Sequence, residues 1–254
     1  MTDAMKAFEL DGLTKRFGDE IAVDELSLTV PKGSFFGMLG PNGAGKTTSL
    51  SMAVGLLRPD AGTARIFGVD VWAEPTEAKA LVGVLPDGLA MPERLTGREA
   101  LLYLGLLRGL PEREVRDRTA ELLDVLELDD TDDKQVAGYS TGMRKKLGLA
   151  IALLHAPRLL VLDEPFEAVD PVSAATIRTI LNRFVENGGS VVMSSHVMAL
   201  VERLCDRVAV VADGKVVAAG TVDEVRAGGT LEDAFVELVG ASTRGVEGLR
   251  WLSA

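Results

Sequence analysis

Short apolar runs typical of β-strands alternate along the chain with stretches in which apolar residues recur at helical spacing. Several runs predict strands, over Phe35–Leu39, Ala64–Phe67, Val82–Leu85, Leu159–Asp163, Ser190–Ser194, Arg207–Ala212 and Lys215–Ala219. A helix is predicted over Thr47–Gly55, shortly after the first of these runs. Asp213–Gly214 predicts a hairpin turn between the last two strands.

A helical pattern separates the strand predicted at residues 82–85 from the next strand. Thr96-Gly97-Arg98-Glu99 forms a capping box that begins a Leu-rich helix running to about Arg108. Further helices are predicted from Pro111 and from Ser140, because apolar residues recur three and four apart. This block covers about residues 88–157. Since strands and helices alternate on both sides of it, we predict an α/β fold: a mostly parallel sheet flanked by helices, with an inserted α-helical subdomain.

The C-terminal region carries a second capping box and a short amphipathic helix. Thr221-Val222-Asp223-Glu224 is the capping box, and a helix is predicted over Leu231–Val239. We therefore expect one main domain over residues 5–225 and a short helical tail over residues 226–254.

Composition excludes several classes of function. The 254 residues can bury a substantial core, and 38 acidic against 27 basic residues give a net charge of −11, which disfavours nucleic-acid binding. No apolar run approaches the ~20 residues that cross a bilayer, and the first residues lack an export signal. The single Cys205 cannot form an internal disulfide. We expect a cytoplasmic protein in which any membrane role requires a partner.

One loop carries the G-x-x-x-x-G-K-[ST] pattern, which binds nucleotide phosphates. It follows the strand over residues 35–39 and consists of Gly40, Pro41, Asn42, Gly43, Ala44, Gly45, Lys46, Thr47 and Thr48. Glycines let successive backbone N–H groups curve around phosphates, and the helix that follows directs its positive end toward the same anion. Lys46 is expected to reach the β- and γ-phosphates, and Thr47 to ligate Mg²⁺.

Two adjacent carboxylates, Asp163 and Glu164, stand at the end of the strand predicted over Leu159–Asp163. A phosphate loop requires a carboxylate near Mg²⁺ and a group that activates water. We expect Asp163 to contact Mg²⁺ and Glu164 to polarise the attacking water. The alternative is that both carboxylates are solvated residues at an ordinary strand end.

The order of three further segments resembles that of the ABC ATPases. Tyr139–Lys146, YSTGMRKK, is similar to the LSGGQ signature, Glu167–Asp170 to the D-loop, and Ser194–His196 to the H-loop. The resemblance spans nearly the whole chain. It implies a P-loop NTPase core with antiparallel β-elements near the N-terminus.

The resemblance implies ATP and Mg²⁺ as cofactors and a head-to-tail dimer of ATPase domains. In this family each ATP lies between the P-loop of one subunit and the signature of the other, so Ser140 and the Gly142 N–H would hold the partner's γ-phosphate. His196 would contact the γ-phosphate and order Glu164, and Asp170 would organise the dimer contact. From the residues alone, Ser140 is explained as a helix N-cap and His196 as a structural histidine.

Two positions in the nucleotide site depart from the family pattern. Asp87 stands where the Q-loop usually carries Gln, and it could meet Mg²⁺ through water while adding negative charge beside the phosphates. Phe17 takes the place of the adenine-stacking aromatic, more often Tyr, although a core or loop-packing role is the alternative.

The signature also differs, because Thr141 and Met143 replace a Gly and a Gln. The basic run Arg144–Lys146 that follows is expected to face solvent or the nucleotide entrance. His155, at the end of an apolar helix face, is expected in the core or at a C-terminal cap.

The resemblance leads to three alternative hypotheses about the function. The first is the ATPase subunit of a transporter at the cytoplasmic face of the membrane, with a permease on a separate chain. The signature and the tail resemble ATPases of bacterial drug and antibiotic exporters, so export is favoured, with the permease pressing near Asp87–Arg98. The second is a soluble ABC ATPase of an assembly complex. The third, a regulator without turnover, conflicts with Glu164 and His196.

Overall fold

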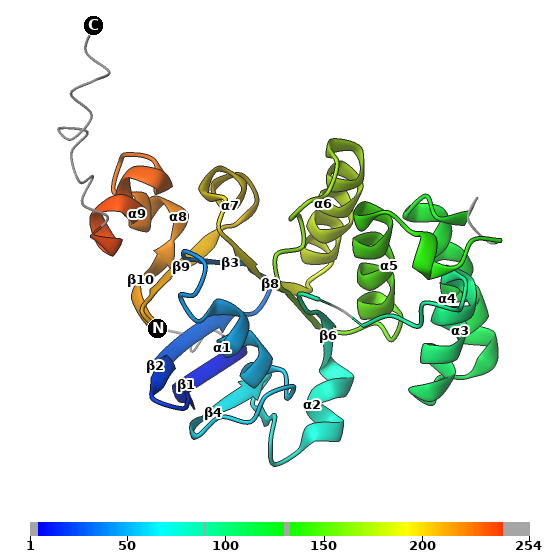
Figure 1. Cartoon of the computed structure of the whole chain (residues 1–254), viewed down its shortest axis with the longest axis horizontal. Helices are drawn as coiled ribbons and strands as arrows, with labels where there is room; N and C mark the ends of the chain where they lie inside the picture. Colours follow the sequence, from blue (N-terminus) through cyan, green and yellow to red (C-terminus); the bar gives the residue numbers. More distant parts are fainter. Residues whose placement is uncertain (1–4, 89, 130–132, 241–254) are drawn as a thin grey trace, which may run out of the picture.

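In the computed structural model the chain forms two sheets with helices around them (Figure 1). The structure describes residues 5–88, 90–129 and 133–240. Of the expected tail over residues 226–254, the last 14 residues therefore lie outside the described residues. No helix in the described ranges is long and apolar enough to cross a membrane.

The larger sheet has six strands in the order β10-β9-β3-β8-β7-β6. Its strands are β3 Phe35–Leu39, β6 Val82–Leu85, β7 Leu159–Leu162, β8 Ser190–Ser195, β9 Arg207–Ala212 and β10 Lys215–Thr221. All neighbours pair in parallel except β9 and β10, which form the predicted hairpin. Asp213 and Gly214 both adopt positive φ at its turn, as a type I′ turn requires.

The smaller sheet is antiparallel, with the order β2-β1-β4-β5. Its strands are β1 Lys6–Phe17, β2 Glu20–Pro31, β4 Ala61–Ile66 and β5 Val69–Asp70. This confirms antiparallel β-elements near the N-terminus. The register between β1 and β2 shifts repeatedly, including between Leu10 and Leu13, so their sequences do not alternate regularly.

Helices cover both faces of the larger sheet. They are α1 Lys46–Ala53, α2 Pro75–Leu81, α3 Gly97–Leu107, α4 Glu112–Val125, the 3₁₀ helix η2 Val136–Gly138, α5 Thr141–Leu153, α6 Pro171–Glu186, α7 Met198–Leu204, α8 Val222–Arg226 and α9 Leu231–Val239. Figure 1 shows α3, α4 and α5 beyond one edge of the sheet, next to β6. The capping boxes at Thr96 and Thr221 are present, and so is the Ser140 N-cap.

Two apolar cores lie on opposite faces of the six-stranded sheet. Side chains alternate along a strand, so Leu160 and Leu162 of β7 join the core with the helical subdomain, whereas Leu159 and Val161 join the core with α1 and the smaller sheet. Every residue of β7 is buried. This explains the continuous apolar run, because a parallel strand covered on both faces needs no polar side.

β6 and the end of α5 approach each other closely. A Cβ on Gly83 would lie 2.1 Å from the carbonyl oxygen of Ala152, so the packing excludes any side chain there. Just beyond α5, the Nε2 of His155 lies 3.0 Å from the Val82 carbonyl oxygen, and its buried Nδ1 has no hydrogen-bond partner among the described residues. Burial, together with the charge of Arg108, lowers the pKa of His155 to about 4.

We predict that His155 makes stability fall as the pH decreases from 6.5 toward 4. In this window the unfolded chain binds a proton at His155 that the folded chain excludes, and protonation therefore favours unfolding. The measurement is thermal unfolding of wild-type and His155→Gln protein between pH 7 and pH 4.5. The Gln variant should lose less stability than the wild type. Equal losses in both proteins would show that His155 is protonated in the fold.

Candidate functional site

The phosphate loop connects β3 to α1 and is shaped by glycines. Gly45 has φ 96° and Gly43 has φ 83°, a region that favours glycine. A Cβ on Gly45 would lie 2.4 Å from the Ala22 carbonyl oxygen, and one on Gly40 would lie 2.4 Å from that of Val211. No side chain caps the N-terminus of α1 and its first turn holds no acidic residue, so its N–H groups are available to an anion.

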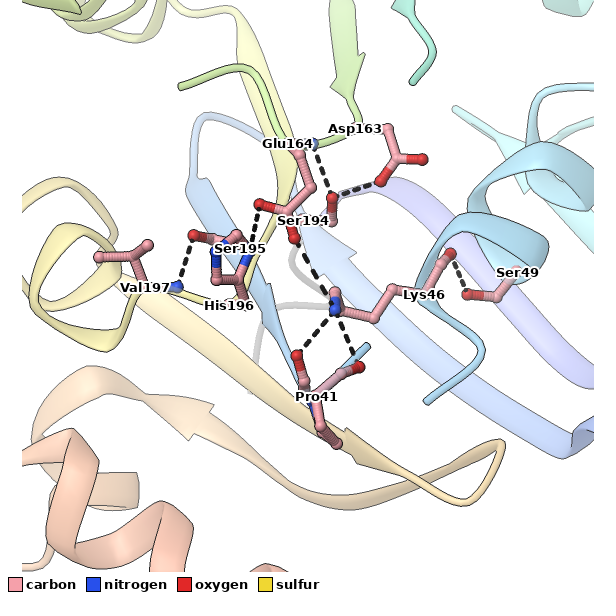
Figure 2. Close-up of polar contacts among 10 residues, drawn as sticks. Pro41, Lys46, Ser49, Asp163, Glu164, Ser194, Ser195, His196 and Val197 are labelled. Carbon is pink, nitrogen blue, oxygen red and sulfur yellow. Dashed lines mark hydrogen bonds and ion pairs between the residues drawn. The ribbon is translucent and has the colours of Figure 1, made fainter. Parts of the chain in front are cut away.

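Lys46 is a buried cation in this loop. Its Nζ donates to the carbonyl oxygens of Gly40, at 2.7 Å, and Pro41, at 3.2 Å, and lies 3.8 Å from Oε1 of Glu164 (Figure 2). Burial lowers the pKa of Lys46, and the nearby Glu164 and Asp163 carboxylates oppose that shift. The ammonium is thus held at the floor of the loop, where a phosphate group would meet it.

Asp163 and Glu164 follow β7 directly, so the strand ends one residue earlier than predicted. The Asp163 side chain is buried and accepts a hydrogen bond from the Ser194 hydroxyl. The Glu164 side chain lies nearer the surface, with Oε2 at 3.1 Å from Nδ1 of His196 (Figure 2). The parallel pairing of β7 and β8 places the residues after both strands at one edge, which brings His196 to Glu164.

A cleft of about 440 Å³ brings most of the predicted nucleotide residues together. Its lining includes the predicted residues Phe17, Asn42, Gly43, Ala44, Gly45, Lys46, Thr47, Thr48, Asp87, Glu164 and His196. Three predicted residues are not part of this lining: Gly40, Pro41 and Asp163. The backbone carbonyl oxygens of Gly40 and Pro41 accept hydrogen bonds from Lys46, and the Asp163 carboxylate accepts one from Ser194.

Sequence reasoning did not assign a site role to three residues that also line the cleft. They are Glu20, Ala22 and Glu167. Glu20 and Ala22 belong to the β1–β2 hairpin, whose strands were not delimited from the sequence. Phe17, at the end of β1, is 52% exposed and lines the cleft, with the Nζ of Lys15 5.8 Å from its ring centroid. Glu20 follows the turn after Phe17, so the predicted adenine-stacking position of Phe17 could have indicated from the sequence that Glu20 lies near the nucleotide.

Asp87 lies just beyond β6 and also faces the cleft. Its Oδ1 accepts a hydrogen bond from the backbone N–H of Gly88, at 3.0 Å. The carboxylate therefore helps to shape its own loop.

The predicted signature residues lie elsewhere, and none of them lines this cleft. Ser140 caps α5, with its hydroxyl accepting from the Met143 N–H at 3.2 Å. Asp170 caps α6, where hydrogen bonds from Ser173 lower its pKa. The two helix starts touch, because a Cβ on Gly142 would lie 3.0 Å from Oδ2 of Asp170.

The expectation for the basic run after the signature was only partly right. Arg144 is on the surface and donates to the Ala137 carbonyl oxygen. Lys146, however, is buried, and its Nζ pairs with Glu127 at 3.1 Å. Lys145 turns inward and donates to the backbone carbonyl oxygen of Glu164, at 2.9 Å. Helical periodicity directs these neighbours to different sides of α5.

A parallel sheet with a glycine loop between β3 and α1, facing two carboxylates after β7, defines a P-loop ATPase.

A family profile described as ABC transporter matches residues 23–167. The daunorubicin/doxorubicin resistance ATP-binding protein DrrA of Streptomyces peucetius is 40% identical over 89% of this chain and 68% of that protein. The Nod factor export ATP-binding protein I of Sinorhizobium fredii is 39% identical over 84% of this chain and 62% of that protein.

A solved structure described as the ATP binding subunit of an ABC transporter superposes with a TM-score of 0.84. It is 29% identical and covers 91% of this chain and 99% of that one. The chain belongs to the ABC transporter family, as an ATP-binding subunit with ATPase activity.

We predict that Lys46→Ala abolishes ATP binding, because it removes the buried cation that faces the phosphate loop. Titration with a fluorescent ATP analogue measures the Kd, which should rise at least ~100-fold. Lys79→Ala, on α2 outside the cleft, is the matched control and should bind normally. A Kd within two-fold of wild type for Lys46→Ala would contradict the assignment.

Proposed function

We propose that this chain is the ATPase subunit of an exporter and drives a permease that is a separate polypeptide at the cytoplasmic face of the membrane. The observation that carries the proposal is the contact of Glu164 with both Lys46 and His196 at the phosphate loop. Export is supported by the relatives, one of which is named for drug resistance and one for Nod factor export.

The residues of the cleft suit ATP and Mg²⁺. The glycine loop and the uncapped start of α1 offer backbone donors to phosphate oxygens, and the exposed face of Phe17 offers a stacking surface to adenine. Mg²⁺ would be held by Thr47 and Asp163, with Asp87 acting through water, and would neutralise charge on the phosphates. Because Mg²⁺ in such sites binds phosphates and water as well as protein, few protein ligands suffice.

Glu164 is the proposed general base and His196 its partner. With its carboxylate beside the phosphate loop, Glu164 can accept a proton from a water molecule that attacks the γ-phosphate. The imidazole of His196, at 3.1 Å from the other carboxylate oxygen, limits the rotation of that side chain. Lys46 would counter negative charge that accumulates on the phosphoryl group.

A second ATPase subunit is proposed to complete each site. Ser140 and Gly142 begin α5 with donors suited to a phosphate, yet neither lines the cleft of its own chain. A head-to-tail dimer would place them against the ATP bound by the partner, with Asp170 at the contact.

Within each subunit, residues 5–225 would form the ATPase domain, residues 88–157 its helical subdomain and residues 226–254 the tail. The permease is proposed to contact the segment Asp87–Arg98.

We predict that Glu164→Gln binds ATP normally but hydrolyses it at least ~100-fold more slowly, because the amide cannot accept the proton from water. ATP should then convert the variant from monomer to dimer, which light scattering after gel filtration would measure. Adding Ser140→Ala and Gly142→Ala to this variant should reduce dimer formation. Normal turnover by Glu164→Gln would require another base.

We predict that tagged Glu164→Gln protein, with ATP, recovers a polytopic membrane protein from detergent-solubilised membranes of the source cell. Mass spectrometry would identify it, and Lys46→Ala protein is the control because it should not reach the ATP-bound state. Recovery of soluble proteins alone would instead favour an ATPase of a non-transport assembly complex.

A further inference from the structure

The backbone of Glu164 has an unusual conformation for a residue with a side chain. Its φ is 45°, in the left-handed region, which is strained for a residue other than glycine. A conformation of this kind persists only where surrounding contacts hold it. The direction of the Glu164 carboxylate depends on this backbone, so the contacts that hold it also aim the carboxylate.

Two side chains bind the peptide groups on either side of Glu164. The Ser194 hydroxyl accepts the Glu164 N–H at 2.9 Å and donates its own proton to the Asp163 carboxylate. Lys145 donates from its ammonium to the Glu164 carbonyl oxygen at 2.9 Å, and the same oxygen accepts the backbone N–H of Glu167 at 3.2 Å. One donor and one acceptor of the same residue are thus held by elements far apart in sequence, β8 and α5.

The burial of Ser194 and the charge of Lys145 both favour firm hydrogen bonds to the Glu164 backbone. Ser194 is fully buried, so its hydroxyl has no water to bind and its two hydrogen bonds are confined to Asp163 and Glu164. Lys145 is half-buried, and its ammonium bonds to the backbone. A bond from a charged donor is stronger than one between neutral groups. Its neighbours Arg144 and Lys146 contact Ala137 and Glu127 instead.

We propose that Lys145 and Ser194 are positioning residues that hold the Glu164 backbone from opposite sides and so aim its carboxylate into the cleft. Lys145 lies in the second turn of α5, the helix that Ser140 caps. The signature helix therefore holds the base of its own chain, while its N-terminus is proposed to meet the ATP of the partner subunit. The first statement rests on the proposed role of Glu164 as the general base, and the second, which links the two ATP sites, rests on the proposed dimer as well.

The first experiment measures kcat, KM and the melting temperature of Lys145→Met. Loss of the bond should lower kcat about 10-fold, whereas KM for ATP should stay within two-fold because the phosphate loop is untouched. Lys145→Arg, which retains a cationic donor, should recover most of kcat. Arg118→Met, which removes a part-buried cation of α4 that donates to the Leu154 carbonyl oxygen outside the cleft, is the matched control and should keep the wild-type kcat.

Ser194 is tested in the same way. Ser194→Ala should lower kcat at nearly constant KM, and Ser190→Ala is its control. Ser190 is also fully buried on β8, and its hydroxyl accepts from the Gly33 N–H at 2.8 Å, away from the cleft. A role limited to stability would lower the melting temperature of both serine variants and leave both kcat values intact, which would overturn the proposal.

A double-variant test separates positioning from general damage. If Lys145 acts through the Glu164 carboxylate, adding Lys145→Met to Glu164→Gln should leave the residual rate unchanged. A further 10-fold loss would overturn the proposal. ATP-induced dimer formation by Glu164→Gln alone reports on the proposed function: its absence contradicts the dimer, whereas a normal dimer with wild-type kcat in Lys145→Met contradicts the positioning role.

Discussion

The parallel pairing of β3, β8 and β7 is the constraint on which the site depends. Leu39 of β3 pairs with Ser195 of β8, and Met193 of β8 pairs with Leu162 of β7. Parallel strands direct their carboxyl ends to the same edge of the sheet. The phosphate loop, the two carboxylates and His196 therefore emerge beside each other, although long stretches of chain separate them in the sequence.

The cleft at this edge is acidic like the chain as a whole, because, among the described residues, Glu20, Asp87, Glu164 and Glu167 line it against one cation, Lys46. A protein with a net charge of −11 must still attract a highly anionic nucleotide. Lys46 and the backbone donors of the loop face the cleft, and Glu164 lies 3.8 Å from Lys46. The Glu164 and Asp163 carboxylates oppose the effect of burial on the pKa of Lys46, which burial lowers overall.

Patterns within short stretches of sequence predicted much of the fold. The helix starts at Thr96 and Thr221 were visible because a capping residue and its partner lie three positions apart, and the start at Ser140 because apolar residues recur at helical spacing after it. The strands β1 and β2 were not delimited, because their bulges interrupt the alternation of apolar and polar residues. The phosphate loop was predictable because consecutive residues form it.

Contacts between distant elements could not be predicted in this way. The inward turn of Lys145 and the two bonds of Ser194 depend on how α5 and β8 pack around the end of β7. A basic run on a helix is usually solvated, so its sequence alone indicated a surface role. Only the packed structure distinguishes Lys145 from Arg144.

The sequence by itself determined the chemistry of this protein: the phosphate loop, the two carboxylates, the histidine and the order that identifies an ABC ATPase. Each of these features is a motif of neighbouring residues or the order of such motifs along the chain, so it can be recognised without knowing how the chain packs. The tertiary structure decided which groups meet, how Glu164 is held in a left-handed conformation, and that Ser140 and Gly142 lie outside the cleft of their own chain. The physical reason is that such contacts arise from the register of the sheet and the packing of helices on it, which short-range patterns do not encode.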